Sequence, residues 1–183
     1  MWEKFREEKL SEFKRAEVDE EIRDLLELIN SVEVFVTLSS CAGRIAVMDM
    51  PSFGEKLESV FLGKWHSPPD FDEVLKAVKR GRKTTWLMMH PPIVHVACRD
   101  LESAEKILSV AKKAGFRRSG LISFKKLVVE IASPERLEVV VSENGKMADE
   151  NFLKINYEYA VKKILRSRER MKKFEKEFKE AFL

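Results

Sequence analysis

The C-terminal part of the chain repeats its hydrophobic residues at alternating steps of four and three. The series consists of Leu153, Tyr157, Ala160, Ile164, Ser167, Met171, Phe174, Phe178 and Ala181. Such heptad spacing predicts one continuous helix over residues 149–183, which would be roughly 50 Å long at ~1.5 Å per residue. A seam of this length has to lie against another surface. Two surfaces are open to it: the helices at the start of the same chain, or a second subunit in a homodimer.

Helical spacing also describes residues 1–30, where we expect two helices, over residues 1–15 and 19–30. Their apolar positions are Trp2, Phe5, Leu10, Phe13, Ile22, Leu25, Leu26 and Ile29. Asp19 is placed to cap the second helix.

The period changes in residues 33–142, where short β-branched and aromatic runs are typical of strands. The predicted strands cover residues 34–38, 44–50, 60–66, 84–89, 93–99, 116–124, 127–131 and 137–141. Residues 39–43 form a short loop that joins the first two strands, and Pro51, Ser52 and Gly54 end the second strand.

Two further helices interrupt the strands. One begins at Asp70, which forms a capping box with Glu73, and the other begins at Asp100 and ends at Gly115. Strands and helices do not alternate regularly, and no glycine-rich turn follows the first strand, so the Rossmann fingerprint is absent. We expect an α+β fold with seven or eight strands in a mixed, largely antiparallel sheet, flanking helices and a long C-terminal helix.

Length and composition limit the class of protein to which the chain can belong. A chain of 183 residues, 44% hydrophobic, is long enough for a single domain over residues 1–183. No apolar run approaches the ~18 residues that span a bilayer. Two cysteines make no disulfide framework and suggest no metal site, and the N-terminus is no signal peptide, so we expect a reduced cytoplasmic protein. The absence of Gln beside abundant Lys and Glu favours a heat-loving source.

The charge is unevenly distributed along the chain. The net charge is +3, but residues 60–126 alone hold 14 basic and 6 acidic residues. A basic middle third attracts anionic partners, and nucleic acid is the first candidate, although a well-solvated surface would look the same.

Residues 37–44 form the first stretch whose side chains could take part in binding or catalysis. Ser39, Ser40, Cys41, Gly43 and Arg44 place two hydroxyls, a thiol, a glycine and a guanidinium in one short connection. Such a connection can offer hydroxyl and backbone N–H donors to an anion, with the arginine as a bidentate fork. A polar hairpin turn with Arg44 in a surface ion pair is the simpler interpretation. A nucleophilic Cys41 is also conceivable, although no paired histidine is evident.

The second stretch is residues 93–99. Strand alternation puts His95 and Arg99 on one face and Cys98 on the other, where Cys98 behaves as a small buried apolar residue. A histidine can handle protons near neutral pH and an arginine can bind anions, but a lone histidine in a strand can equally be structural.

The remaining candidates are mostly basic. Arg117 and Ser119 lie between a helix end and a strand, beside two glycines, where they could hold phosphate, although a glycine at a helix end is equally a plain structural feature. A cluster at another helix end consists of Lys79, Arg80, Arg82 and Lys83. These charges favour the helix dipole and are equally placed to touch a nucleic-acid backbone.

Residues 39–45, 92–99 and 114–120 together resemble the family of the third tRNA wybutosine-synthesizing protein, as do residues 18–20 and the long, charged C-terminal helix. The resemblance covers nearly the whole chain in order. It implies a methyltransferase that uses S-adenosylmethionine and methylates a ring nitrogen of a tricyclic guanosine derivative beside the anticodon of phenylalanine tRNA. The family fold is α/β-mixed and unlike the Rossmann methyltransferases.

The resemblance also suggests roles for the candidate residues. His95 would be the base, with Ser39 and Cys41 as further catalytic candidates. Ser40, Gly43 and Arg44 would hold the amino-acid end of the cofactor, or a phosphate flanking the base. The candidates for contact with substrate or RNA are Arg99, Arg117, Ser119, Trp86, Lys79, Arg80, Arg82 and Lys83, with Trp86 or Trp65 receiving the unstacked base. Two alternatives remain open: a non-catalytic RNA-binding module that uses the basic middle third, and a thiol enzyme built on Cys41.

Overall fold

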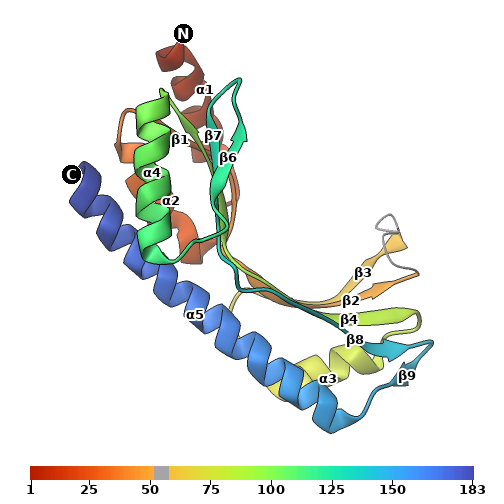
Figure 1. Cartoon of the computed structure of the whole chain (residues 1–183). Coiled ribbons are helices and arrows are strands. Elements are labelled where there is room, and N and C mark those ends of the chain that lie inside the picture. The colour runs from red at the N-terminus through yellow and green to blue at the C-terminus, as the bar shows by residue number, and fades with distance from the viewer. Residues whose placement is uncertain (52–57) are drawn as a thin grey trace. The chain divides into compact units, whose positions relative to one another are not determined.

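A computed structural model describes residues 1–51 and 58–183 and divides the chain into two compact units (Figure 1). The first unit holds Met1–Ala42, Pro92–Pro134 and Ser167–Leu183, and the second holds Gly43–Pro91 and Glu135–Arg166. Ser52 and Gly54, which we expected to end a strand, lie outside the described residues.

The first unit is built on a four-stranded antiparallel sheet in the order β1-β5-β7-β6. Its strands are β1 (Phe35–Cys41), β5 (Ile93–Cys98), β6 (Gly120–Ser123) and β7 (Val128–Ala132). Its helices are α1 (Trp2–Arg15), α2 (Glu20–Ser31), α4 (Leu101–Ala114) and the second half of α5 (Glu150–Phe182).

The two faces of this sheet are covered differently. Helices α2, α4 and α5 share the main core with one face, where Phe35 packs against Phe178 and Phe182 with ring centroids 5.8 and 4.9 Å apart. Burying a side chain such as Phe35 or Phe178 stabilises the fold by roughly 1.5–3 kcal/mol. On the other face, helix α1 covers a small cluster, which consists of Val36, Ala97 and Val128 under Trp2, Phe5 and Leu10.

The second unit is built on a five-stranded antiparallel sheet in the order β3-β2-β4-β8-β9. Its strands are β2 (Arg44–Met50), β3 (Val60–Trp65), β4 (Thr84–His90), β8 (Leu137–Glu143) and β9 (Lys146–Met147). Helix α3 (Phe71–Lys79) and the first half of α5 pack on one face, as Figure 1 shows, and share a core with Ile45, Val47 and Leu87.

Several local predictions are confirmed. The α+β class, the antiparallel pairing and the long C-terminal helix are as expected, and Asp70 and Glu73 form the capping box of α3. Asp100 caps α4, and Gly115 ends it in the left-handed conformation at φ +97°. All seam residues of α5 except Tyr157 and Ala181 are buried within this chain. The seam is therefore used inside the chain, and it gives no support to a homodimer.

The predicted connection between the first two strands is wrong. Residues 39–41 belong to strand β1 and pair with β5, whereas β2 begins at Arg44 in the other sheet. Gly43 turns the chain between them at φ +79°, a conformation that glycine adopts without steric cost. The described residues form nine strands in two sheets, instead of seven or eight in one.

The expected N-cap of α2 also differs. Asp19 makes no side-chain cap bond to its own helix. Its Oδ2 atom instead accepts the backbone N–H of Ala42 at 2.8 Å, and so fixes the end of β1 to the start of α2.

Among the described residues, no helix is long and apolar enough to cross a membrane.

Candidate active site

Three polar side chains form a row across adjacent strands of the first unit. Ser39 on β1 pairs in register with His95 on β5, and His95 pairs with Glu130 on β7. Directly paired residues in an antiparallel sheet project from the same face. The row continues to Gly120 on β6, where an added Cβ would meet no heavy atom within 4 Å, so it ends in open space.

Both ring nitrogens of His95 are engaged by this row. Nδ1 lies 2.7 Å from Oγ of Ser39, and Nε2 lies 2.9 Å from Oε2 of Glu130. A carboxylate can only accept, so Nε2 carries the hydrogen of the neutral imidazole and Nδ1 accepts from the Ser39 hydroxyl. His95 and Glu130 are 26% and 30% exposed, which leaves the row accessible to a substrate.

A β-bulge puts Ser39 in this row. The register between β1 and β5 shifts between Thr37 and Ser39, so Leu38 is an extra residue. Strict alternation from Phe35 would place Ser39 on the face that helices α2 and α4 cover. The bulge turns it to the opposite face, beside His95.

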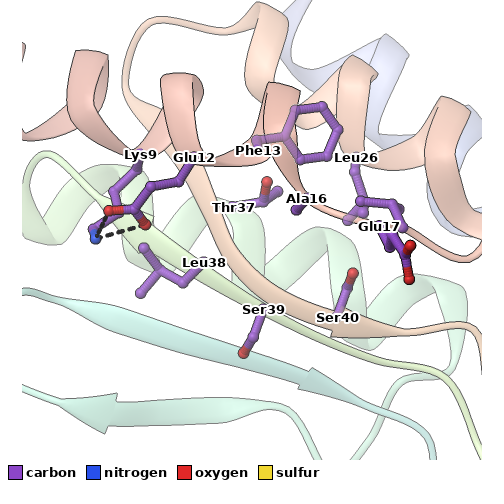
Figure 2. A pocket seen from close by; sticks show the side chains of 11 residues that line it. Lys9, Glu12, Phe13, Ala16, Glu17, Leu26, Thr37, Leu38, Ser39 and Ser40 are labelled. Carbon is purple, nitrogen blue, oxygen red and sulfur yellow. Dashed lines mark hydrogen bonds and ion pairs between the residues drawn. The ribbon is translucent and has the colours of Figure 1, made fainter.

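A groove of about 300 Å³ borders the row at Ser39. It lies between β1 and the residues that end α1 and lead into α2, and Figure 2 shows Ser39 and Ser40 leaving β1 on opposite sides. Phe13 and Leu38 give the groove an apolar wall, while Lys9 supplies a cation, paired with Glu12 at 2.7 Å.

Cys41 ends strand β1 as a partly exposed free thiol. The partly buried Arg168 of α5 lies within electrostatic reach of it. Burial lowers the pKa of Arg168, while Glu21, Cys41 and Asp19 act in the opposite direction. The bonds described for His95 go to Ser39 and Glu130, so this histidine is not the base that a nucleophilic Cys41 would need.

The other cysteine behaves as predicted. Cys98 is 2% exposed, and burial raises the pKa of its thiol to about 12.

Arg99 does not join His95. It follows the end of β5, where its Nε lies 3.1 Å from Asp100, and it lines a groove with Trp2 and Phe5 that contains no residue of the row. Strand alternation correctly puts Arg99 on the same face as His95, beside α1, but α1 packs over Ala97, which lies between the two residues along the strand.

The corner before β6 lies next to the row. Arg117 is exposed, and the Oγ atom of Ser119 accepts the backbone N–H of Ala132 at 3.1 Å. The hydroxyl of Ser119 therefore holds β7 in place and retains its own hydrogen for donation. Gly120, which follows it, pairs with Glu130.

The remaining predicted residues belong to the second unit. The carbonyl of Gly43 lies 2.9 Å from Nδ1 of His66, and the guanidinium of Arg44 lies 5.7 Å from the ring centroid of Phe61. Trp86 is half-buried on β4, and Trp65 packs against the core of this unit.

The basic cluster occupies the end of α3 and the turn into β4. Arg80 donates to the carbonyl of Leu62, and Lys83 pairs with Glu58 at 3.3 Å. The backbone N–H groups of Arg82 and Lys83 donate to the buried carboxylate of Asp49, while the side chains of Lys79 and Arg82 are exposed. This network orders the turn and leaves cations on its surface.

Sequence reasoning missed Glu130 and the contact of Asp19. Glu130 interrupts the apolar run from Val128 to Ile131. A carboxylate within an apolar strand could have identified Glu130 as a candidate functional residue. Asp19 was interpreted only as a cap. Within the described residues, no group of three or more His, Cys, Asp or Glu side chains could hold a metal ion.

Comparisons with known proteins show the family to which this chain belongs. The model of the family described as Methyltransferase TYW3 matches residues 1–180. A protein of Archaeoglobus fulgidus, named tRNA(Phe) 7-((3-amino-3-carboxypropyl)-4-demethylwyosine(37)-N(4))-methyltransferase, is 48% identical over 93% of this chain and 90% of its own length. A Pyrococcus furiosus protein with the same name and the number 1 is 43% identical over 88% of this chain and 85% of its own.

Solved structures agree. The PH1069 protein of Pyrococcus horikoshii superposes with a TM-score of 0.93 at 40% identity, over 97% of this chain and 95% of that chain. A hypothetical protein of Aeropyrum pernix gives a TM-score of 0.77 at 28% identity, over 89% of this chain and 98% of that chain. These relatives come from thermophilic archaea, as the composition suggested. By sequence and by structure, the chain belongs to the TYW3 methyltransferase family and is a methyltransferase.

Proposed function

We propose that this enzyme transfers the methyl group of S-adenosylmethionine to the N4 ring nitrogen of 7-(3-amino-3-carboxypropyl)-4-demethylwyosine, beside the anticodon of phenylalanine tRNA. The printed names of the relatives support the substrate, since the chain covers most of their length. The observation that carries the proposal is the row of Ser39, His95 and Glu130, because methylating a nitrogen that bears a hydrogen requires a group that takes the proton.

The proton has a defined route in this row. Because both His95 nitrogens are engaged, the substrate proton passes to Oγ of Ser39 while the Ser39 proton passes to Nδ1 of His95. The new N–C bond forms as the carbon–sulfur bond breaks, and the carboxylate of Glu130 stabilises the imidazolium that results. Ser39 and His95 are then catalytic residues, and Glu130 is a positioning residue that fixes the tautomer.

The groove beside Ser39 fits the methyl donor. Its volume of about 300 Å³ is at the lower end of the ~300–1,000 Å³ typical of small-molecule sites. Phe13 and Leu38 offer apolar surface to an adenine ring, while Lys9 and Ser40 offer donors to a carboxylate. When bound there, S-adenosylmethionine supplies an electrophilic methyl group on a positively charged sulfur. Gly43 and Arg44 remain predicted cofactor contacts, and Cys41 remains a predicted catalytic residue.

The substrate contacts are also proposals. Ser119 directly precedes Gly120, which pairs with Glu130 of the row, and Arg117 is exposed two residues before Ser119; both are suited to phosphate or to the charged side chain of the modified base. Arg99 lies apart from the row and is better suited to the RNA backbone, as are Lys79, Arg80, Arg82 and Lys83. An enzyme with this substrate would work in the cytoplasm.

The test is transfer of radiolabel from S-adenosylmethionine to precursor tRNA that lacks this methyl group. We expect labelled tRNA with the precursor and none with fully modified tRNA. RNA binding without label transfer would contradict the proposal and favour a non-catalytic module.

A further inference from the structure

A second cross-strand row crosses the sheet of the second unit. Phe61 on β3 pairs with Met48 on β2, Met48 pairs with Trp86 on β4, and Trp86 pairs with Val140 on β8. Paired residues share a face, so these four apolar side chains form one stripe across the sheet. We call them the apolar row.

The apolar row lies on the face opposite to the helices. Ile45, Val47 and Leu87, which alternate with Met48 and Trp86 along their strands, are the residues that pack on α3 and α5. In the core clusters formed by residues 1–51 and 58–183, no member of the row is included, and Phe61 and Val140 are 47% and 38% exposed. An antiparallel sheet facing water normally carries polar side chains there, so a row of this kind indicates a binding surface.

Positively charged side chains lie beside the apolar row. Arg44, Ala46 and Met48 are alternate residues of β2 and therefore lie on one face. The guanidinium of Arg44 lies 5.7 Å from the ring centroid of Phe61. Lys64, paired with Ala46, is exposed on this face.

Two acidic side chains lie on this face, Glu138 and the exposed Glu143, which pairs in register with Thr84 two residues before Trp86. Glu138 pairs with Arg136 and with His90. Although burial opposes it, the hydrogen bonds from these two partners hold the pKa of Glu138 below its usual value. The basic turn at residues 79–83 leads into β4 just before Trp86, so positive charge also borders the end of the row.

We propose that this face binds unpaired bases of the RNA substrate, with Phe61 and Trp86 as stacking surfaces and Lys64 and the basic turn as phosphate contacts. The inference rests on the proposed tRNA substrate. Aromatic side chains interleaved with cations complement unstacked bases on an anionic backbone. A second protein copy would bury the apolar row equally well, but it would gain nothing from the surrounding cations.

The test measures RNA affinity of the full chain by fluorescence anisotropy. The probe is a labelled RNA stem-loop with the anticodon-loop sequence of phenylalanine tRNA. Phe61→Leu removes the ring but keeps an apolar side chain at a half-exposed site, so the fold should persist, and circular dichroism checks this. We expect about tenfold weaker binding, because base–aromatic stacking is worth ~5- to 150-fold per base. Phe61→Tyr should bind within about twofold of wild type.

Two controls make the result specific. Phe152→Leu changes a phenylalanine of similar exposure (42%) on α5, which covers the other face, and should not alter affinity. Lys64→Gln should flatten the log–log salt dependence by about 0.7 for each single-strand phosphate lost.

Three outcomes would overturn the inference: Phe61→Leu binds as wild type does, Phe61→Leu weakens a fully paired hairpin to the same extent, or the substitution alters only the oligomeric state in light scattering. Failure of the proposed function is read separately, from label transfer by the wild-type enzyme.

Discussion

Oγ of Ser39 lies 2.7 Å from Nδ1 of His95, although 56 residues separate them in the chain. The contact depends on the bulge at Leu38, which moves Ser39 to the face of the sheet that carries His95, opposite to α2 and α4. One irregular strand residue thus brings a hydroxyl and an imidazole together, with Glu130 behind them.

Removing the imidazole should stop the chemistry and leave RNA binding intact. His95→Ala is expected to lower kcat by at least ~100-fold, the lower limit for a general base. Single-turnover label transfer and filter binding measure the two quantities. A near-normal rate would exclude His95 from the mechanism.

Glu130 should act through His95. Glu130→Gln keeps an acceptor for the Nε2 hydrogen but removes the charge that stabilises the imidazolium. We expect kcat to fall by roughly 10- to 100-fold, a part of the ~100- to 10,000-fold that acid–base catalysis provides, with unchanged tRNA affinity. The kcat of Glu130→Ala should be lower still, and Glu130→Asp should retain part of the wild-type kcat. Glu105→Gln, in an exposed residue of α4, is the control. Equal rates for Gln, Ala and Asp variants would rule out the positioning role.

The two cysteines should react differently with a thiol reagent. Cys41 is partly exposed and Cys98 is buried, so one thiol should be modified in the native enzyme and two after unfolding. Mass spectrometry of peptides identifies the site. Cys41→Ser tests the thiol alternative, because a serine that preserves turnover leaves no role for a nucleophilic thiol.

Alkaline pH should destabilise the fold through Cys98. Burial raises the pKa of this thiol from 9.0 to about 12, so the neutral thiol is favoured in the folded state. The stabilisation is complete below pH 9 and is lost as the pH rises from 9 to about 12, at up to about 1.4 kcal/mol per pH unit. Urea unfolding of wild type and Cys98→Ala across this range measures the difference. Parallel pH dependences would contradict the assignment.

The expectation of a single domain remains a proposal, and unfolding can test it. Each unit is assembled from separate chain segments, and α5 contributes residues to both, so we expect one cooperative transition. In Trp2→Phe, fluorescence reports only Trp65 and Trp86 in the second unit, while circular dichroism reports both units. Coincident thermal midpoints are expected, and two separated midpoints would show independent domains.

Local signals in the sequence predicted most elements correctly. The capping box of Asp70 and Glu73 and the heptad seam from Leu153 to Phe178 depend on neighbours within a few residues, so spacing alone reveals them. The connection at residues 39–43 failed because its polar composition is typical of a turn. Residues 39–41 are nevertheless paired with β5, about 50 residues away, which no local pattern records.

The sequence by itself determined the helices, most of the strands and the fold class, because periodicity, caps and motifs are properties of nearby residues. Only the tertiary structure decided which side chains meet. Strand order and a single bulge join Ser39, His95 and Glu130, while the packing of α1 over Ala97 excludes Arg99. Long-range pairing is set by which surfaces bury the most apolar area together, and that is a property of the whole chain.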